Sequence, residues 1–287
     1  GMRPAAFEYH RAASIEEALS LLAEFGEDGR PIAGGQSLVP MMNLRLARPE
    51  HLVDINSLEL DKIERTGDTL SLGALVRHER YFNAPLIAEH FPAFLDAAHW
   101  IGHPTIRRHG SLGGSISHAD PSAELPCVCV LHDATIVARS VNGERRIPAS
   151  EFFISAYVTA LEPGEMVVAV ELPIPQRKQH GAFIEIAERM GDFAVIGIGA
   201  VLELDGDTVL DARIACAGAE LTPVRAASAE QFLKGRQLTE EVALEAGQLF
   251  AQSVDPVNDY RSSAEYRRHL IVQLTSRTLM RAMKSKA

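Results

Sequence analysis

Two short glycine-rich stretches carry the clearest chemical signal in this sequence. The first is Ala33-Gly34-Gly35-Gln36-Ser37, and the second is Ser111-Leu112-Gly113-Gly114-Ser115. Adjacent glycines let the backbone approach a ligand closely, and converging N–H groups and hydroxyls suit the charged oxygens of a diphosphate. Either stretch alone is explained as a tight turn. Together they predict a cradle for a phosphorylated cofactor.

Other motifs that carry chemistry elsewhere are incomplete in this chain. Gly197-Ile198-Gly199 lacks the third glycine of a dinucleotide-binding fingerprint, and no Walker lysine follows either glycine stretch. Residues 113–117 lack the last glycine of a hydrolase nucleophile elbow. His99 and His103 have the spacing of zinc ligands without the glutamate of a zinc-protease motif, so we interpret them as ordinary histidines. We expect no catalytic residue and no metal ligand.

Composition limits the class of protein. Of the 287 residues, 46% are hydrophobic and 23% charged, and the net charge is -10, which makes a nucleic-acid partner improbable. No apolar run is long enough to predict a membrane span. Cys127, Cys129 and Cys216 lack the spacing of a disulfide framework or of a four-thiolate cluster site. These cysteines favour a reducing, cytoplasmic location.

Helices and strands in alternation are predicted to position the first glycine stretch. Ser14-Ile15-Glu16-Glu17 is a helix-capping box, and the apolar residues after it repeat at helical spacing. A strand at 30–33 runs into the glycines, and another strand is predicted at 51–55. A β-α-β unit with glycines at a strand end is a common ligand-binding place.

The second glycine stretch lies in a longer run of predicted elements. Residues 58–74 predict two strands that turn at Thr66-Gly67-Asp68, and helices are expected at 77–82 and 85–101. We place the glycine pair itself in a turn. Asp120-Pro121-Ser122 then signals a helix at 123–132, and strands are expected at 134–140 and 164–172.

A break at Pro173-Ile174-Pro175 marks the predicted boundary between two domains. Beyond it, segments 182–188, 193–204 and 208–217 predict a three-stranded antiparallel sheet, and 227–233, 239–252 and 264–283 predict helices. The fold class is α+β. We expect one domain at 1–176, made of two α/β subdomains at about 1–57 and 58–176, and a domain of sheet and helices at 177–287.

Four separated motifs resemble one known family. They are AGGQSL at 33–38, IRRHGSLGGSISHADPSAELP at 106–126, GDFA at 191–194 and SAEYRRHL at 263–270, in order over nearly the whole chain. The chain resembles the FAD-binding medium subunit of the molybdenum hydroxylases, the carbon monoxide dehydrogenase and xanthine dehydrogenase family. The resemblance implies an FAD-binding domain of the vanillyl-alcohol oxidase (PCMH) type, followed by the small domain of sheet and helices.

The resemblance also implies a function and a set of site residues. Family members are electron-transfer oxidoreductase subunits: an iron–sulfur small subunit and a molybdopterin large subunit hold the other cofactors, and electrons pass from the clusters through FAD to an acceptor. The two glycine stretches would hold the FAD diphosphate and ribityl, and Asp192 and Phe193 would lie beside the isoalloxazine. Carried over by position, the cofactor contacts are Ala33, Gly34, Gly35, Gln36, Ser37, Val39, Ile101, Ser111, Leu112, Gly113, Gly114, Ser115, Asp120, Glu124, Val167, Asp192 and Phe193.

Two alternatives stay open on the sequence alone. One is a stand-alone FAD-dependent reductase or oxidase of the same fold, which would need an acid or base beside the flavin. The other is a scaffold subunit that has lost FAD, because Ser115 stands where the family usually has asparagine, and Glu124 where it usually has aspartate.

Overall fold

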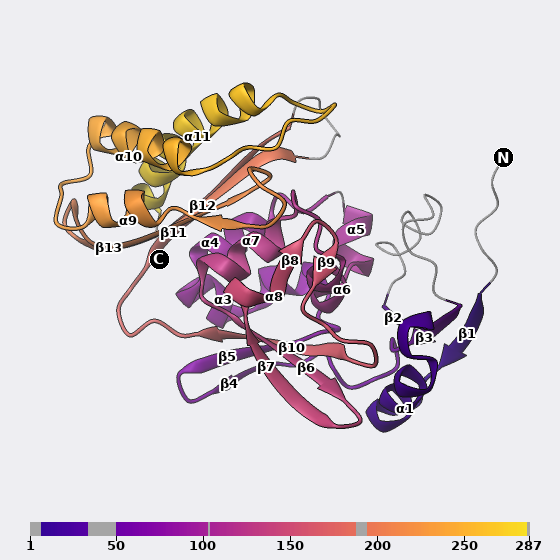
Figure 1. The fold of residues 1–287 in the computed structure, drawn as a ribbon. Coiled ribbons are helices and arrows are strands. Elements are labelled where there is room, and N and C mark those ends of the chain that lie inside the picture. The colour runs from indigo at the N-terminus through magenta and orange to yellow at the C-terminus, as the bar shows by residue number, and fades with distance from the viewer. Residues whose placement is uncertain (1–6, 34–49, 103, 188–193, 286–287) are drawn as a thin grey trace.

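The computed structural model describes residues 7–33, 50–102, 104–187 and 194–285. Its first part is a small parallel sheet with a helix beside it (Figure 1). The strand order is β1-β3-β2, and Ser14 caps the helix by accepting the Glu17 N–H at 3.1 Å, as its capping box predicts. The elements are β1 (Glu8–Arg11), α1 (Ile15–Phe25), a 3₁₀ turn (Gly26–Asp28), β2 (Gly29–Ile32) and β3 (His51–Asp54).

A five-stranded antiparallel sheet forms the base of the middle of the molecule. Its order is β4-β5-β10-β6-β7, so β10 returns from far along the chain to lie between β5 and β6. The predicted turn at Thr66-Gly67-Asp68 joins β4 to β5. The strands are β4 (Ile63–Thr66), β5 (Thr69–Gly73), β6 (Thr135–Ser140), β7 (Gly143–Pro148) and β10 (Met166–Pro173).

Short helices cover this sheet. They are a 3₁₀ helix (His78–Asn83), α3 (Pro85–His90), α4 (Pro92–Ala98), α5 (Pro104–His109), α6 (Leu112–His118), α7 (Glu124–Leu131) and α8 (Ala149–Phe152), followed by the hairpin of β8 (Phe153–Ser155) and β9 (Val158–Thr159). The single helix predicted at 85–101 is wrong. Pro92 lacks a backbone N–H and cannot continue a helix, so it starts α4 instead.

Of two local predictions around the second glycine stretch, one is wrong and one is confirmed. Gly113 and Gly114 lie in the first turn of α6, with Ser111 as the N-cap, and not in a turn between helices. The helix predicted at 123–132 is confirmed as α7, although Asp120-Pro121-Ser122 does not cap it. Asp120 Oδ1 instead accepts the Ser122 N–H at 2.9 Å in a turn, and the helix starts at Glu124.

A second antiparallel sheet and three helices complete the chain. The sheet order is β11-β12-β13-β14, so the three predicted strands gain a fourth of two residues. The elements are β11 (His180–Ala187), β12 (Ala194–Asp205), β13 (Thr208–Ala217), β14 (Val224–Arg225), α9 (Ala227–Leu233), α10 (Glu240–Ser253) and α11 (Ala264–Lys284). In the described part of the chain, no helix combines the length and the apolar character that crossing a membrane requires.

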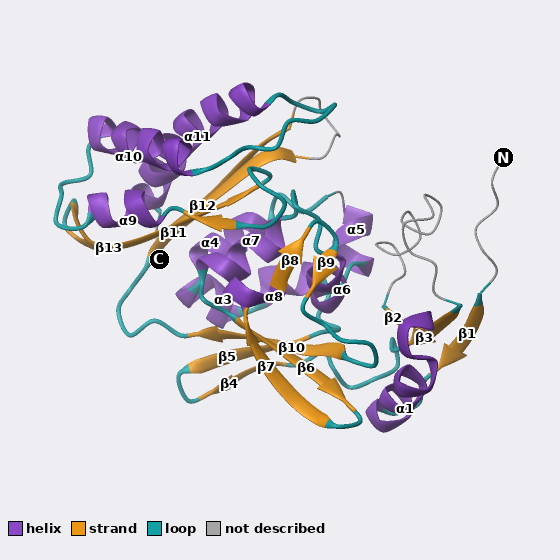
Figure 2. Ribbon diagram, viewed as in Figure 1, coloured by secondary structure: helices purple, strands orange, loops and turns teal. Residues whose placement is uncertain are grey.

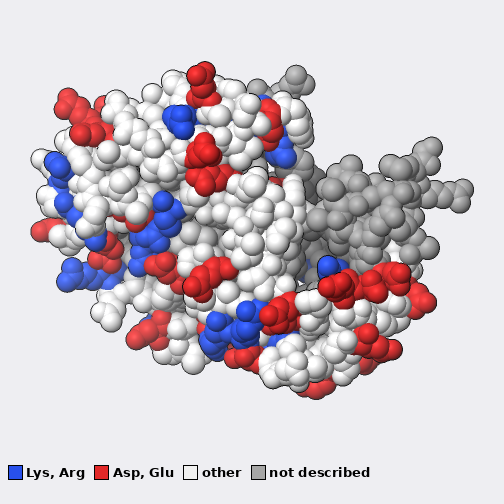
Figure 3. All heavy atoms as spheres, viewed as in Figure 1, with Lys and Arg blue, Asp and Glu red and all other residues white. Residues whose placement is uncertain are grey.

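The molecule is layered, with helices between the two large sheets (Figure 2). One face of the second sheet packs under α9, α10 and α11. The other face joins the core of the middle helices, because Phe183, Val201 and Ala215 belong to the same buried apolar cluster as Phe94 and Leu131. The face shown in Figure 3 carries acidic and basic side chains in small interspersed groups.

Candidate functional site

Ala33, the first residue of the first glycine stretch, approaches the second stretch at the start of α6. β2 ends at Ile32, and the chain then reaches Ala33, the first residue of the first stretch. The carbonyl oxygen of Ala33 lies 3.9 Å from the position that a Cβ would take on Gly114. Segments that are about 80 residues apart in the sequence therefore border the same space, as a shared cradle requires.

Seven of the predicted site residues fall outside the described part of the chain. They are Gly34, Gly35, Gln36, Ser37, Val39, Asp192 and Phe193. The described site is therefore built from Ala33, the second glycine stretch and the acidic residues that follow it.

The two glycines of the second stretch have different roles. A Cβ on Gly113 would lie 2.7 Å from the Ala74 Cβ, so this glycine lets α6 pack against the end of β5. Of the described residues, a Cβ on Gly114 would meet the Ser111 hydroxyl, at 2.9 Å, and the Ala33 carbonyl. Among the described residues, no side-chain atom other than the Ser111 hydroxyl comes near this position, and open backbone of this kind suits a diphosphate.

The backbone N–H groups of this stretch are engaged within the chain, contrary to the expectation of free donors. Leu112 donates to the Val76 carbonyl at 3.0 Å and Gly113 to the Ala74 carbonyl at 2.8 Å. Gly114 donates to Ser111 Oγ at 3.1 Å, and Ser115 to the Ser111 carbonyl. Of these acceptors only Ser111 Oγ is on a side chain that can rotate away, so the Gly114 N–H is the donor that a ligand oxygen can take over.

A buried relay orients the Ser115 hydroxyl. His78 Nε2 lies 3.1 Å from Ser115 Oγ, and His78 Nδ1 lies 3.1 Å from the hydroxyl of the fully buried Tyr81. Burial lowers the pKa of His78 to about 4, so the ring is neutral at pH 7 and carries one N–H. The network is satisfied when Tyr81 donates to Nδ1 and Nε2–H donates to Ser115, which leaves the Ser115 proton for the site.

Three carboxyl groups lie together on the C-terminal side of α6. Glu124 is the first residue of α7, and its side chain is hydrogen-bonded to that of Glu185 on β11. Burial raises the pKa of Glu124 to about 7, and burial together with the charge of Glu124 raises the pKa of Glu185 to about 9. Two carboxyl groups in hydrogen-bond contact share a proton at neutral pH.

The surroundings of this pair agree with a shared proton. Glu185 Oε2 is buried and receives no hydrogen bond from an N–H or hydroxyl group of the described residues. Asp120 adds negative charge beside Glu124, which raises the pKa of Glu124 further. The site can therefore hold a proton in its interior, although the sequence predicted Glu124 only as a cofactor contact.

Ile101, Leu112 and Val167 are predicted site residues with apolar side chains. All three are buried in the middle core. Val167 sits at an irregularity in the pairing of β10 with β6. Arg107 on α5 donates to the carbonyls of His99 and Ile101 and so fixes the backbone at Ile101. The structure therefore places the side chains of these three residues in the core.

Sequence reasoning missed His78, Tyr81 and Glu185. His78 and Tyr81 lie more than 30 residues from Ser115, in a segment without a motif, so no local signal connects them. Glu185 did leave a signal: it is a charged residue within the apolar strand segment Ala182-Phe183-Ile184-Glu185-Ile186.

Two family models match consecutive parts of the chain. A model described as the FAD binding domain in molybdopterin dehydrogenase matches residues 5–175. A model described as the CO dehydrogenase flavoprotein C-terminal domain matches residues 181–282. Together they span nearly the whole sequence.

Similar proteins match over their full length. The chain is 40% identical to the 6-hydroxypseudooxynicotine dehydrogenase complex subunit alpha of Paenarthrobacter nicotinovorans, over 98% of this chain and 96% of that one. It is 34% identical to the carbon monoxide dehydrogenase medium chain of Hydrogenophaga pseudoflava, over 97% of each chain. A solved chain of quinoline 2-oxidoreductase from Pseudomonas putida 86 superimposes with a TM-score of 0.93 at 36% identity, over 99% of both chains.

Proposed function

The chain belongs to the family of FAD-binding medium subunits of the molybdenum hydroxylases, and from that membership we propose that it passes electrons from iron–sulfur clusters through FAD to an acceptor. It is an oxidoreductase subunit of a multi-subunit complex. FAD, when bound, supplies the electron-accepting chemistry, and the protein supplies binding, orientation and electrostatics. Substrate hydroxylation belongs to a partner subunit.

The proposed FAD site combines both glycine stretches. Ala33 to Ser37 and Ser111 to Ser115 hold the diphosphate and ribityl, Asp120 and Glu124 make polar contacts, and Asp192 and Phe193 lie beside the isoalloxazine. The observation that carries this proposal is the approach of the Ala33 carbonyl to the bare α-carbon of Gly114. The Gly114 N–H and the Ser115 hydroxyl, directed by His78, are the donors that we assign to the cofactor.

The proposed partners are an iron–sulfur small subunit and a molybdopterin large subunit. Support comes from relatives that are named as a complex subunit and as a medium chain. Exposed apolar side chains at the β8–β9 hairpin, Ile154, Tyr157 and Val158, are suited to a protein partner.

We propose a cytoplasmic location, because the thiols of the three cysteines are free and buried, as is usual in a reducing compartment. We also propose that the boundary between the two domains lies between residues 176 and 177.

Titration of the purified chain with FAD tests the proposal. We expect one FAD per chain, measured by quenching of flavin fluorescence, and reduction of the bound flavin only after the iron–sulfur and molybdopterin subunits are added with substrate. Absence of binding at excess FAD would refute the site. Steady turnover by the isolated chain would refute the electron-transfer role and favour a stand-alone reductase or oxidase.

A further inference from the structure

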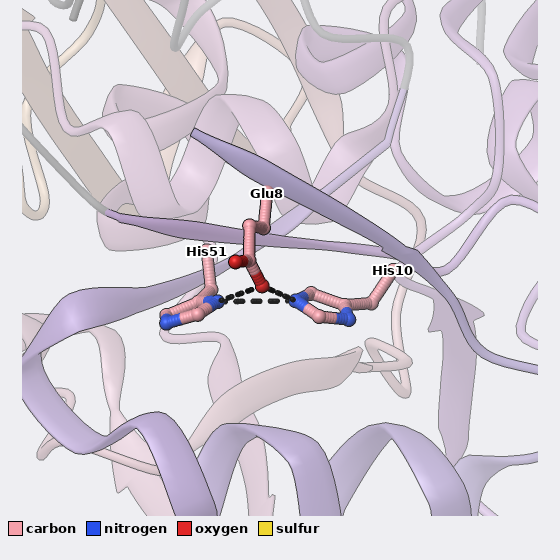
Figure 4. A group of neighbouring side chains, drawn as sticks. All are labelled: Glu8, His10 and His51. Atoms are coloured by element: carbon pink, nitrogen blue, oxygen red, sulfur yellow. Dashed lines mark hydrogen bonds and ion pairs between the residues drawn. The ribbon is translucent and has the colours of Figure 1, made fainter. Parts of the chain in front are cut away.

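A second group of polar side chains lies away from the FAD site, on the small parallel sheet. Glu8 and His10 are two residues apart on β1, so their side chains share a face of the sheet. His51 is the first residue of β3 and pairs with Glu8 in the parallel register. Figure 4 shows the three side chains pointing toward one another.

The separations between the three groups are those of ligands around one ion. His10 Nε2 lies 3.1 Å from His51 Nδ1. The same carboxylate oxygen, Glu8 Oε2, lies 3.7 Å from the His10 nitrogen and 3.5 Å from the His51 nitrogen. Ligand atoms bound to a tetrahedral zinc ion stand about 3.3 to 3.6 Å apart. One ion bound by all three atoms accounts for the three separations together.

Packing against Phe25 positions the two imidazoles without a bound ion. Phe25, the last residue of α1, stacks on His51 with ring centroids 3.8 Å apart and planes 6° apart. The same phenyl ring lies 4.7 Å from the His10 ring. The side chains of His10 and His51 are 26% and 21% exposed, against 73% for Glu8. The site therefore has two fixed ligands and one ligand that reaches in from solvent.

We propose that Glu8, His10 and His51 form a binding site for a divalent transition-metal ion such as Zn²⁺. Two imidazole nitrogens and one carboxylate oxygen are a ligand set that these ions accept, with the fourth position left to water. The ion would join β1 to β3, which is the central strand of this sheet. On the other side of β3 lies β2, which leads to Ala33. The bound ion would stabilise this sheet, and binding of the ion would not depend on FAD.

Calorimetric titration of the chelator-treated full chain with Zn²⁺ tests this site, with Co²⁺ absorption as a second probe of the coordination geometry. We expect one ion per chain, tetrahedral Co²⁺ bands and a higher unfolding temperature with Zn²⁺. His51→Gln and Glu8→Gln should each weaken Zn²⁺ binding by about a hundredfold or more, since losing even a supporting partner lowers metal affinity about 10- to 100-fold. Glu8 is mostly exposed, so Glu8→Gln tests the site without disturbing the fold.

His90→Gln is the matched control. His90 also has a carboxylate nearby, Glu89 at 3.8 Å, but belongs to no three-ligand group among the described residues. Its substitution should leave Zn²⁺ binding unchanged. The proposal is overturned if the chain takes up no stoichiometric Zn²⁺, or if His51→Gln and Glu8→Gln bind it as the unsubstituted chain does.

Discussion

The indole N–H of Trp100 donates to the carbonyl oxygen of Phe183 at 2.9 Å. Trp100 follows α4 in the middle of the molecule, and Phe183 lies on the first strand of the C-terminal sheet. The backbone N–H of the same Phe183 donates to Asp96 Oδ2 at 2.7 Å. α4 and the residues just after it thus bind both backbone groups of a single residue in β11. Trp100 is the only tryptophan in the chain, so its fluorescence reports on this junction.

Asp96→Ala should destabilise the junction by about 2 to 3 kcal/mol, because it leaves the Phe183 N–H buried without an acceptor for a charge-assisted bond. Arg281→Ala is the control. It removes the exposed arginine that also binds Asp96 and should cost less than about 1 kcal/mol. Urea unfolding followed by Trp100 emission measures both changes, and equal losses for the two variants would contradict the argument.

Gly114→Val should abolish FAD binding while the fold survives, with an affinity loss of at least about a hundredfold, or ~2.7 kcal/mol. The new side chain enters the space beside Ala33, and its nearest neighbour is the movable Ser111 hydroxyl. Gly113→Ala should act on stability and not on FAD binding. It should destabilise the protein by about 1 to 3 kcal/mol, because its Cβ meets Ala74. FAD titration and thermal unfolding separate the two effects. Normal FAD affinity in Gly114→Val would place the cradle elsewhere.

Tyr81→Phe should weaken FAD binding by about three- to tenfold, the equivalent of one neutral hydrogen bond. Without the phenol proton, His78 no longer has to present Nε2–H to Ser115, and the Ser115 proton is no longer directed to the site. Ser115→Ala should give a similar loss, and the double variant should lose little more because both act on one contact. Fluorescence titration measures the affinities. Tyr266→Phe, at an exposed position, serves as the control and should bind FAD normally.

Glu185→Gln should reduce the loss of stability at alkaline pH. Burial raises the pKa of Glu185 to about 9 and that of Glu124 to about 7, so the folded protein retains protons that the unfolded chain releases. This contribution is complete below the ordinary glutamate pKa of about 4.5 and is lost as pH rises through the folded values. Calorimetric unfolding temperatures at pH 6 and pH 9 should differ less for the variant than for the unsubstituted chain. An unchanged difference would show that the pair does not hold a proton.

The family and the α+β fold were predictable from the sequence because the signals were local. Four motifs identified the family, and the family match over the chain confirms it. The capping box at Ser14 and the turn at Gly67 are each encoded by a few adjacent residues, and the structure has both. Helix ends were less predictable: the break at Pro92 was missed because the apolar pattern continues across it.

The interior of the site was not predictable in the same way. The Ala33–Gly114 approach was expected, but the engagement of the α6 N–H groups was not, because their acceptors Val76 and Ala74 come from an earlier segment. The proton shared by Glu124 and Glu185 depends on α7 packing against the C-terminal sheet that carries Glu185, and burial of this kind has no sequence motif. Tertiary contacts, which decide protonation and hydrogen bonding, lie outside what local patterns encode.

The core that Phe183, Val201 and Ala215 share with Phe94 and Leu131 has a consequence for dissecting the chain. A cut between the two family regions would leave an apolar surface on each fragment, and separate expression of either fragment would invite aggregation. Calorimetry of the intact polypeptide should accordingly give one cooperative transition for the middle and C-terminal parts, although two separate family models match them.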